Sequence, residues 1–356
     1  MTNPQSAASA PSLAPIERFV RDVIPAVPGG RQFGGDPTGH LALINEAAEE
    51  RGLALRKIGR TTYFYDGRMP VGGMTGWVPT LVSKEAHAVA KSKDLSKQML
   101  DAAGVPTPSG IAVSLDNIDE AVAHVAAARR PLVLKPSAGM KGEGITTGIT
   151  TEDELRAAWQ SAKKAARDDP SLVLEEQADG VDIRAYVVGR RVAAATTRIH
   201  AHVVGDGRHS ITELAAEKQL WRDQHVILKK RPFTIDPVVL ARSGRTIDTV
   251  PDDGEVVVVN GMSNLHVGGE NVDVTDLAHP DLLAVAVDAV RAVPGLGLAG
   301  VDLLVPDIGT ADGAVVLELN VAANIRVHRC PAYGLPRNPA TDIVDEMIAT
   351  TTRTRT

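Results

Sequence analysis

Cysteine, aromatic residues and positive charge are all scarce in this sequence of 356 residues. The single cysteine, Cys330, excludes an internal disulfide framework and fits a reducing compartment such as the cytoplasm. Aromatic residues make up 3% of the chain and the net charge is −6. Both values argue against a nucleic-acid platform, which needs basic side chains and stacking rings. No apolar run approaches the roughly 20 residues of a membrane span. We therefore expect a cytoplasmic globular protein that binds neither nucleic acid nor a membrane.

Hydrophobic residues are plentiful, at 44% of the chain, and the length suffices for two or three modules with sizeable cores. Residues 1–15 are rich in Ser, Ala and Pro and lack both a charged start and an apolar run, so we expect a disordered tail and not a signal peptide. Residues 16–92 are expected to form a small α/β domain. Leu41 to Arg51 has helical periodicity, whereas Leu53 to Ile58 and Thr61 to Tyr65 alternate like strands.

A short apolar segment followed by glycines is the most informative local pattern. Leu132 to Leu134 reads as a buried strand that ends in Lys135, and a turn with three glycines follows, namely Gly139, Gly142 and Gly144. Glycine has no Cβ, so such a turn can lie flat on a ligand and direct backbone N–H groups at phosphate oxygens. Lys135 stands where the last side chain of a strand can reach an α-phosphate. An ordinary hairpin with a surface lysine fits the same stretch.

A second strand runs into a polar segment. Leu172 to Gln177 reads as this strand and its hinge, with Glu175, Glu176 and Gln177 at the end. Backbone groups in such a hinge can hydrogen-bond an adenine edge, and Asp182, a few residues on, can accept ribose hydroxyls. Glu175 and Asp182 also fit solvated charges at strand ends, so neither decides the function alone.

Two apolar strands near the C-terminal end carry polar residues that buried strands usually exclude. Asp302 lies in one strand, and Glu318 and Asn320 lie in the next. A carboxylate buried without a partner costs several kcal/mol. Glu318 and Asn320 are two residues apart and therefore face the same side. If Asp302 lies on the neighbouring strand, three oxygen ligands converge, as Mg²⁺ requires. The alternative is that lysines and arginines elsewhere in the chain satisfy these inward charges.

From about Lys93 to Met347 the sequence resembles the ATP-grasp carboxylate–amine ligases, and within them the branch of the cyanophycin synthetases and the bifunctional glutathione synthetases. The motifs that agree in order and spacing are Gly104 to Pro108, Val204 to Ile211, Asn264 to Gly269, Arg326 to His328, and Arg337-Asn338. The resemblance implies an α/β (α+β) fold in which two α/β subdomains clamp ATP, preceded by the small N-terminal domain. The ATP-grasp domain is expected over residues 93–348, divided at residue 170, with a disordered tail over 349–356.

The resemblance also implies roles for individual residues. Those expected to bind ATP are Lys93, Lys135, Gly139, Gly142, Gly144, Glu175, Glu176, Gln177 and, at the ribose, Asp182. Those expected to bind one or two Mg²⁺ ions, or Mn²⁺, are Asp302, Glu318 and Asn320. Those expected to contact phosphate, the substrate carboxylate or an oxyanion are Arg184, Arg198 and Arg326. No general base stands out, and the candidates are His200, His266 and His328.

Three departures from the family pattern concentrate on the acceptor side. Asn260 stands where an arginine is usual, with Lys229 or Lys230 as candidate replacements. His200 replaces a usual proline, and Ala323-Asn324 replaces a usual Pro-Gly. These changes point to an unusual substrate.

The implied reaction joins a small carboxylic acid or amino acid to an amine. The carboxylate attacks the γ-phosphate of ATP, and the amine then displaces phosphate from the acylphosphate. Family members are often homodimers. Three alternatives share the same nucleotide residues: a kinase that phosphorylates a hydroxyl, a ligase that closes a ring within one substrate, and a non-catalytic nucleotide-binding module. The intact metal ligands argue against the last.

Overall fold

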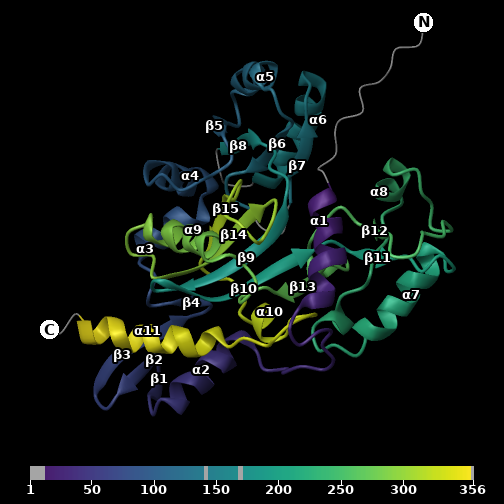
Figure 1. Cartoon of the computed structure of the whole chain (residues 1–356). Coiled ribbons are helices and arrows are strands. Elements are labelled where there is room, and N and C mark those ends of the chain that lie inside the picture. The colour runs from purple at the N-terminus through teal and green to yellow at the C-terminus, as the bar shows by residue number, and fades with distance from the viewer. Residues whose placement is uncertain (1–12, 140–142, 167–170, 354–356) are drawn as a thin grey trace, which may run out of the picture.

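The computed structural model describes residues 13–139, 143–166 and 171–353, and it has three α/β layers and one small subdomain (Figure 1). No helix within these ranges combines the length and the apolar character needed to cross a membrane. The α/β fold predicted from the sequence is confirmed by strands and helices that alternate along most of the chain.

The N-terminal segment, residues 13–92, contributes a sheet that packs against helices from both ends of the chain, whereas Ile16, Phe19 and Val20 at its start are buried in the apolar cluster of the five-stranded sheet described below. Its elements are α1 (Ala14–Arg18), η1 (Phe19–Val23), η2 (Ile24–Ala26), α2 (His40–Glu50), β1 (Ala54–Ile58), β2 (Thr61–Asp66), β3 (Met69–Thr75), β4 (Val78–Pro79) and α3 (Lys84–Lys91). The strands form an antiparallel sheet in the order β1-β2-β3-β4. Phe64 and Ile44 share one buried cluster with Met347 of α11 (Pro339–Arg353). A Cβ on Gly72 would lie 2.5 Å from the Met347 sulfur, so glycine lets α11 approach β3 closely.

A second layer carries the predicted strand and glycine turn. Its elements are α4 (Lys93–Ala102), β5 (Gly110–Ser114), α5 (Ile118–Ala127), β6 (Leu132–Pro136), β7 (Thr146–Ile149), α6 (Glu152–Ala166) and β8 (Ser171–Glu176). The strands form an antiparallel sheet in the order β5-β8-β6-β7. Leu155, Trp159 and Ala162 of α6 recur at helical spacing and are buried against this sheet, so the apolar stripe of α6 covers one face.

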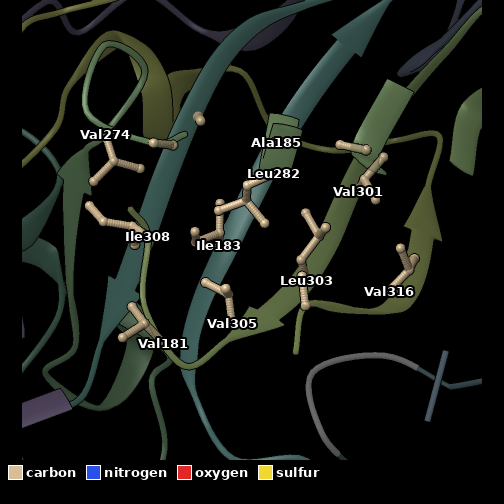
Figure 2. Close-up of a cluster of buried hydrophobic side chains, with 14 of the residues drawn as sticks. Val181, Ile183, Ala185, Val274, Leu282, Val301, Leu303, Val305, Ile308 and Val316 are labelled. Atoms are coloured by element: carbon tan, nitrogen blue, oxygen red, sulfur yellow. The ribbon is translucent and has the colours of Figure 1, made fainter. Parts of the chain in front are cut away.

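The third layer is an antiparallel sheet in the order β13-β10-β9-β14-β15. Its strands are β9 (Val181–Val188), β10 (Arg191–Ile199), β13 (Glu270–Asp273), β14 (Leu298–Val305) and β15 (Val315–Asn320). Successive side chains on a strand point to opposite faces. Val181, Ile183 and Ala185 therefore share the buried apolar face with Leu303 and Val305 of β14 (Figure 2). Helix α9 (Pro280–Arg291) contributes residues to the same cluster.

The small subdomain, residues 201–260, has its own apolar cluster. It contains β11 (His202–Val204), α7 (Ile211–Arg222), η3 (Leu228–Lys230), α8 (Pro237–Arg242) and β12 (Val256–Val258), and it is followed by η4 (Leu265–Val267). Ser210 and Glu213 form a capping box that fixes the start of α7. In Figure 1 this subdomain projects to the side of the five-stranded sheet.

The C-terminal end differs from the sequence prediction. After α10 (Arg326–Arg329), α11 continues to Arg353, so residues 349–353 are helical and the disordered tail predicted over 349–356 is wrong for this part. Thr351 donates a hydrogen bond to the carbonyl oxygen of Val71 at 2.8 Å. The last turn of α11 is therefore tied to β3, a contact between distant segments that local composition does not reveal.

Candidate active site

A small pocket between the sheet β5-β8-β6-β7, α4 and β15 is lined by three lysines. It is lined by Lys93, Ser96, Lys97, Leu100, Thr107, Pro108, Lys135, Glu175, Val316 and Leu317, and we call it the lysine pocket. The Nζ atom of Lys135 lies 2.5 Å from Oε1 of Glu175, and both side chains are less than a tenth exposed. Lys93, the first residue of α4, lines the same pocket. The structure thus brings together three residues that the sequence assigned to nucleotide binding.

The rest of the predicted hinge is used differently. The Glu176 carboxylate lies 3.9 Å from Arg130 at the surface. Gln177 is buried, and its side-chain oxygen accepts a hydrogen bond from the backbone N–H of Gly148 at 2.8 Å. Its own backbone N–H donates to the carbonyl of Pro131. The Gln177 side chain therefore links the segment that follows β8 to β7, on the other side of β6.

The predicted glycine turn is described in part, because Gly142 lies outside the described residues. Gly144 has a φ of +73°, and a Cβ there would lie 2.5 Å from the Cβ of Ala165. Both facts require glycine at this position. A Cβ on Gly139 would instead meet only Pro136, at 3.8 Å.

The five-stranded sheet carries a second cluster on the face opposite its apolar core. Register places Thr196, Arg184, Asp302 and Glu318 opposite one another in successive pairs across β10, β9, β14 and β15. Arg198 and Asp182 form the next pair. We call this cluster the charged face, which consists of Asp182, Arg184, Arg198, Asp302, Glu318 and Asn320.

Ion pairs join four residues of the charged face, in the order Arg184, Asp302, Arg198 and Asp182. Nε and Nη2 of Arg184 each lie 2.7 Å from an oxygen of Asp302. Nη2 of Arg198 lies 3.0 Å from Asp302 and 2.7 Å from Asp182. Burial alone would raise the pKa of Asp302, but the two guanidinium groups outweigh it and hold that pKa below its ordinary value. Asp302 is therefore ionised and fully compensated by arginine.

Glu318 connects the charged face to the lysine pocket. Its Oε2 atom lies 3.9 Å from Nζ of Lys93. Burial and the neighbouring Asp302 charge raise the pKa of Glu318. Asn320, two residues on, accepts a hydrogen bond from the backbone N–H of Ala322 through its side-chain oxygen. The predicted adjacency of the three polar residues on β14 and β15 is therefore confirmed, with Asp302 directly opposite Glu318.

The donor chemistry of these three residues fits Mg²⁺, because two carboxylates and an amide supply only hard oxygen ligands. Within the described ranges, no three His, Cys, Asp or Glu side chains converge as a metal-binding group. Phosphate oxygens would have to complete any coordination sphere here. Arginines occupy both Asp302 oxygens, as the alternative interpretation of the sequence expected for an inward charge.

A short segment packs on the charged face beyond Asn320. A Cβ on Gly300 would lie 2.6 Å from the Cβ of Ala323, so Ala323 sits directly over β14. Nδ1 of His328 lies 2.7 Å from the Thr196 hydroxyl, and burial lowers the pKa of His328 to about 3. Nε of Arg326 and Nε2 of His328 are buried without a hydrogen-bond partner among the residues that the structure describes. This segment forms a wall of the site with unused polar atoms.

The departures from the family pattern have structural explanations. The Asn260 amide donates to the carbonyl of Thr234 and accepts from the N–H of Met262, so its side chain is used within its own loop. Lys229 and Lys230 are exposed on η3. His200 is half-buried, and burial lowers its pKa.

The Ala323-Asn324 departure lies at the start of α10, and the Asn324 side chain accepts a hydrogen bond from the N–H of Arg326 at 3.0 Å.

Sequence reasoning missed two contributors to the site. The Ser263 hydroxyl donates to Asp182 at 3.1 Å, from a loop whose only sequence signal was its pair of glycines. Lys97 lines the lysine pocket one helical turn after Lys93, and its Nζ donates to the Thr107 hydroxyl at 2.7 Å. The spacing of four residues in the motif Lys93 to Lys97 could have revealed this second lysine.

Comparisons with known proteins identify relatives of this chain. Residues 92–185 match the family described as the Carbamoyl-phosphate synthase L chain, ATP binding domain. Cyanophycin synthetase from Trichormus variabilis is 36% identical over 267 residues, which cover 72% of this chain and 29% of that protein. The Glutathione biosynthesis bifunctional protein GshAB from Enterococcus faecalis is 30% identical over 284 residues, which cover 74% of this chain and 36% of that protein.

The fold is also found in a solved structure. The crystal structure of a bifunctional glutathione synthetase from Pasteurella multocida superposes with a TM-score of 0.63 at 24% identity, covering 88% of this chain and 44% of that one. The chain spans about a third of the length of the curated relatives it matches.

Proposed function

This chain contains an ATP-grasp domain related to those of the cyanophycin synthetases and the bifunctional glutathione synthetases, and from this premise we propose that it is an ADP-forming ligase. It uses ATP to convert a substrate carboxylate into an acylphosphate. It then joins the acyl group to an amine and releases ADP and phosphate. The carboxylate belongs to an amino acid or another small acid, and the product is an amide or a peptide.

The observation that carries this proposal is the contact between the lysine pocket and the charged face. Lys93 lines the pocket and also lies 3.9 Å from Glu318. Transfer of a phosphoryl group to a carboxylate brings two anions together, so catalysis depends on positive charge on both sides of the transferred group. Lys93 and Lys135 supply it on the pocket side, and Arg184 and Arg198 supply it across the sheet.

The proposed metal ligands complete this arrangement. Asp302, Glu318 and Asn320 would hold Mg²⁺, with Mn²⁺ as a substitute and one or two ions at the site. When bound, the cation neutralises charge on the phosphates of ATP. The raised pKa of Glu318 supports this role, because a divalent cation favours the ionised carboxylate that burial and Asp302 otherwise disfavour.

The amide-forming step needs groups that stabilise an oxyanion and orient an amine. Arg198 and Arg326 are the proposed donors to the oxyanion. His328 is neutral at physiological pH because burial lowers its pKa to about 3, so it orients groups by hydrogen bonding and does not carry charge. Nε2 of His328 and Nε of Arg326 have no hydrogen-bond partner among the described residues, which supports a polar acceptor site at this wall.

A phosphate-release screen tests the proposal. The purified protein is incubated with ATP, Mg²⁺ and pairs drawn from the common amino acids and small acids, and both phosphate and ADP are measured. A ligase releases equal amounts of phosphate and ADP only when an acid and an amine are both present. Mass spectrometry then finds a product whose mass is the sum of the acid and the amine minus one water.

Other outcomes of the same screen would contradict the proposal. A stable phosphorylated product without free phosphate would identify a kinase. The matched control is Glu318→Gln, which preserves the shape of a side chain that is 35% exposed but removes the negative charge of a proposed metal ligand. If Glu318→Gln released phosphate at the wild-type rate, the metal assignment would be wrong even for an active ligase.

A further inference from the structure

Both oxygens of the Asp302 carboxylate are already occupied by guanidinium groups. Arg184 donates to each oxygen at 2.7 Å, and Arg198 donates to the second oxygen at 3.0 Å. Only 3% of Asp302 is exposed, so water does not compete for these positions. A divalent cation at Asp302 therefore competes with the two arginines, because these donors use three of the roughly four lone-pair sites of the carboxylate and their charges repel a cation.

The two arginines are held in the same way. Arg198 also binds both oxygens of Asp182, at 2.7 and 2.8 Å. The Arg184 and Arg198 side chains are 14% and 22% exposed, so neither guanidinium is offered freely to a dissolved anion. In this state the charged face satisfies itself, and it presents neither a free carboxylate to a metal nor a free arginine to a substrate.

We propose that Arg184 and Arg198 act as internal counter-ions of Asp302 and that a nucleotide-bound divalent cation displaces them, which opens an oxyanion site between the two guanidinium groups. This inference rests on the proposed function, since it concerns the same metal ligands. It adds an order of events: the nucleotide and its metal bind first, and the substrate carboxylate binds second, to arginines that the metal has released.

Charge balance supports the exchange. Three carboxylates on the charged face, Asp182, Asp302 and Glu318, are matched by Arg184, Arg198 and, at 3.9 Å from Glu318, by Lys93. An added cation replaces the arginines as partner of Asp302, and the incoming phosphate and carboxylate oxygens become partners of the arginines. Asp302 and the two arginines thus each exchange one charged partner for another, which limits the cost of the exchange.

Asp182, the second partner of Arg198, has a further hydrogen-bond donor. Asp182 accepts a hydrogen bond from the Ser263 hydroxyl at 3.1 Å in addition to the Arg198 pair. When Arg198 turns toward an anion, Asp182 keeps this polar partner. Thr196 and His328 border Arg184 on the other side, where the imidazole is neutral and does not compete for the anion.

Binding of Mn²⁺ alone, without nucleotide, tests the competition directly. Free Mn²⁺ is measured by electron paramagnetic resonance during titration of the wild-type protein, Arg198→Gln and Arg184→Gln. We expect weak binding to the wild type. Loss of either guanidinium removes both a competitor for the Asp302 oxygens and a nearby like charge, so affinity for Mn²⁺ should rise by about tenfold or more.

Two further variants keep the result specific. Arg51 follows the last residue of α2, and its guanidinium pairs with Asp345 of α11, away from the charged face. Arg51→Gln removes this guanidinium and should leave Mn²⁺ affinity unchanged. Glu318→Gln combined with Arg198→Gln should abolish the gain, because it removes the negative charge of a carboxylate at the same site. If Arg184→Gln fails to fold, the Mn²⁺ affinity of Arg198→Gln decides the outcome. Arg198→Gln should fold, because Asp302 keeps both hydrogen bonds from Arg184 in this variant.

Several outcomes would overturn the inference. These are a folded Arg198→Gln protein with wild-type Mn²⁺ affinity, an equal gain in Arg51→Gln, or a gain that survives loss of Glu318. The measurement uses neither ATP nor substrates, so its result is separate from the phosphate-release screen. An active ligase with unchanged Mn²⁺ affinity in Arg198→Gln would refute the exchange alone.

Discussion

Replacement of Lys135 should destabilise the protein as well as weaken nucleotide binding. The Lys135 and Glu175 side chains are 8% and 7% exposed and lie 2.5 Å apart. Lys135→Ala leaves the Glu175 carboxylate buried beside a cavity, and removal of one partner from a buried ion pair costs about 3–5 kcal/mol. In large domains each kcal/mol lowers the melting temperature by about 2–4 °C, so we expect a fall of roughly 6 °C or more.

The second half of this prediction separates stability from ligand binding. In Lys135→Met combined with Glu175→Gln no charge remains to be compensated, and the replacement of a buried pair by uncharged residues is often neutral. The double variant should therefore recover most of the lost stability while ATP affinity, measured by calorimetry, stays low. A surface lysine would behave differently. If Lys135→Ala melted within about 2 °C of the wild type, or if the double variant were no more stable than the single one, the buried-pair argument would fail.

Three further predictions concern other parts of the chain. Glu318→Gln should abolish ADP formation with little change in melting temperature, since the Glu318 side chain is 35% exposed and its ion-pair partner Lys93 lies 3.9 Å away; a large loss of stability would contradict this. Gly110→Ala should disrupt β5, because a Cβ there would lie 2.4 Å from a carbonyl oxygen of β8, and a melting curve unchanged from the wild type would refute it. Acid should unfold the protein early: burial lowers the pKa of His40 and His202 to about 4 and of His328 to about 3, so the unfolded chain binds protons first as the pH falls below about 6.5. The free energy of unfolding, from urea titrations, should fall by about 4 kcal/mol per pH unit between pH 6 and 5, and a slope below half of this would count against three buried neutral histidines.

The adjacency of the proposed metal ligands was predictable because strand geometry is local. A period of two residues places Glu318 and Asn320 on one side of β15, and one antiparallel pairing brings Asp302 opposite Glu318. The lysine pocket was predictable in part: the strand pattern located Lys135 at the end of β6, and the family resemblance assigned Lys93 to ATP binding. The strand pairing and the strand end are local information, whereas the assignment of Lys93 depends on the resemblance.

The resting partners of these residues were not predictable from the sequence. Asp182 was assigned to the ribose, whereas the structure pairs it with Arg198 and Ser263. The Asp182–Arg198 pair lies across the consecutive strands β9 and β10. The pairing of Arg184 with Asp302 depends on the adjacency of β9 and β14, and these two residues are 118 positions apart in the sequence. No periodicity in β9 indicates that Arg184 will face Asp302. The helical end of the chain was missed for a similar reason, because α11 is stabilised by a sheet formed near the N-terminus.

The two faces of the five-stranded sheet explain how one fold serves both stability and chemistry. Residues at odd positions of β9 from Val181 to Val187 are buried in an apolar cluster, and this face stabilises the fold. The alternate positions Asp182 and Arg184 stand among opposite charges on neighbouring strands, so each charge is compensated before any ligand arrives. Such a face tolerates burial only while its charges are paired. A ligand that brings its own charges, such as a metal–nucleotide complex, can rearrange those pairs at little net cost, and this is the property that phosphoryl transfer between anions requires.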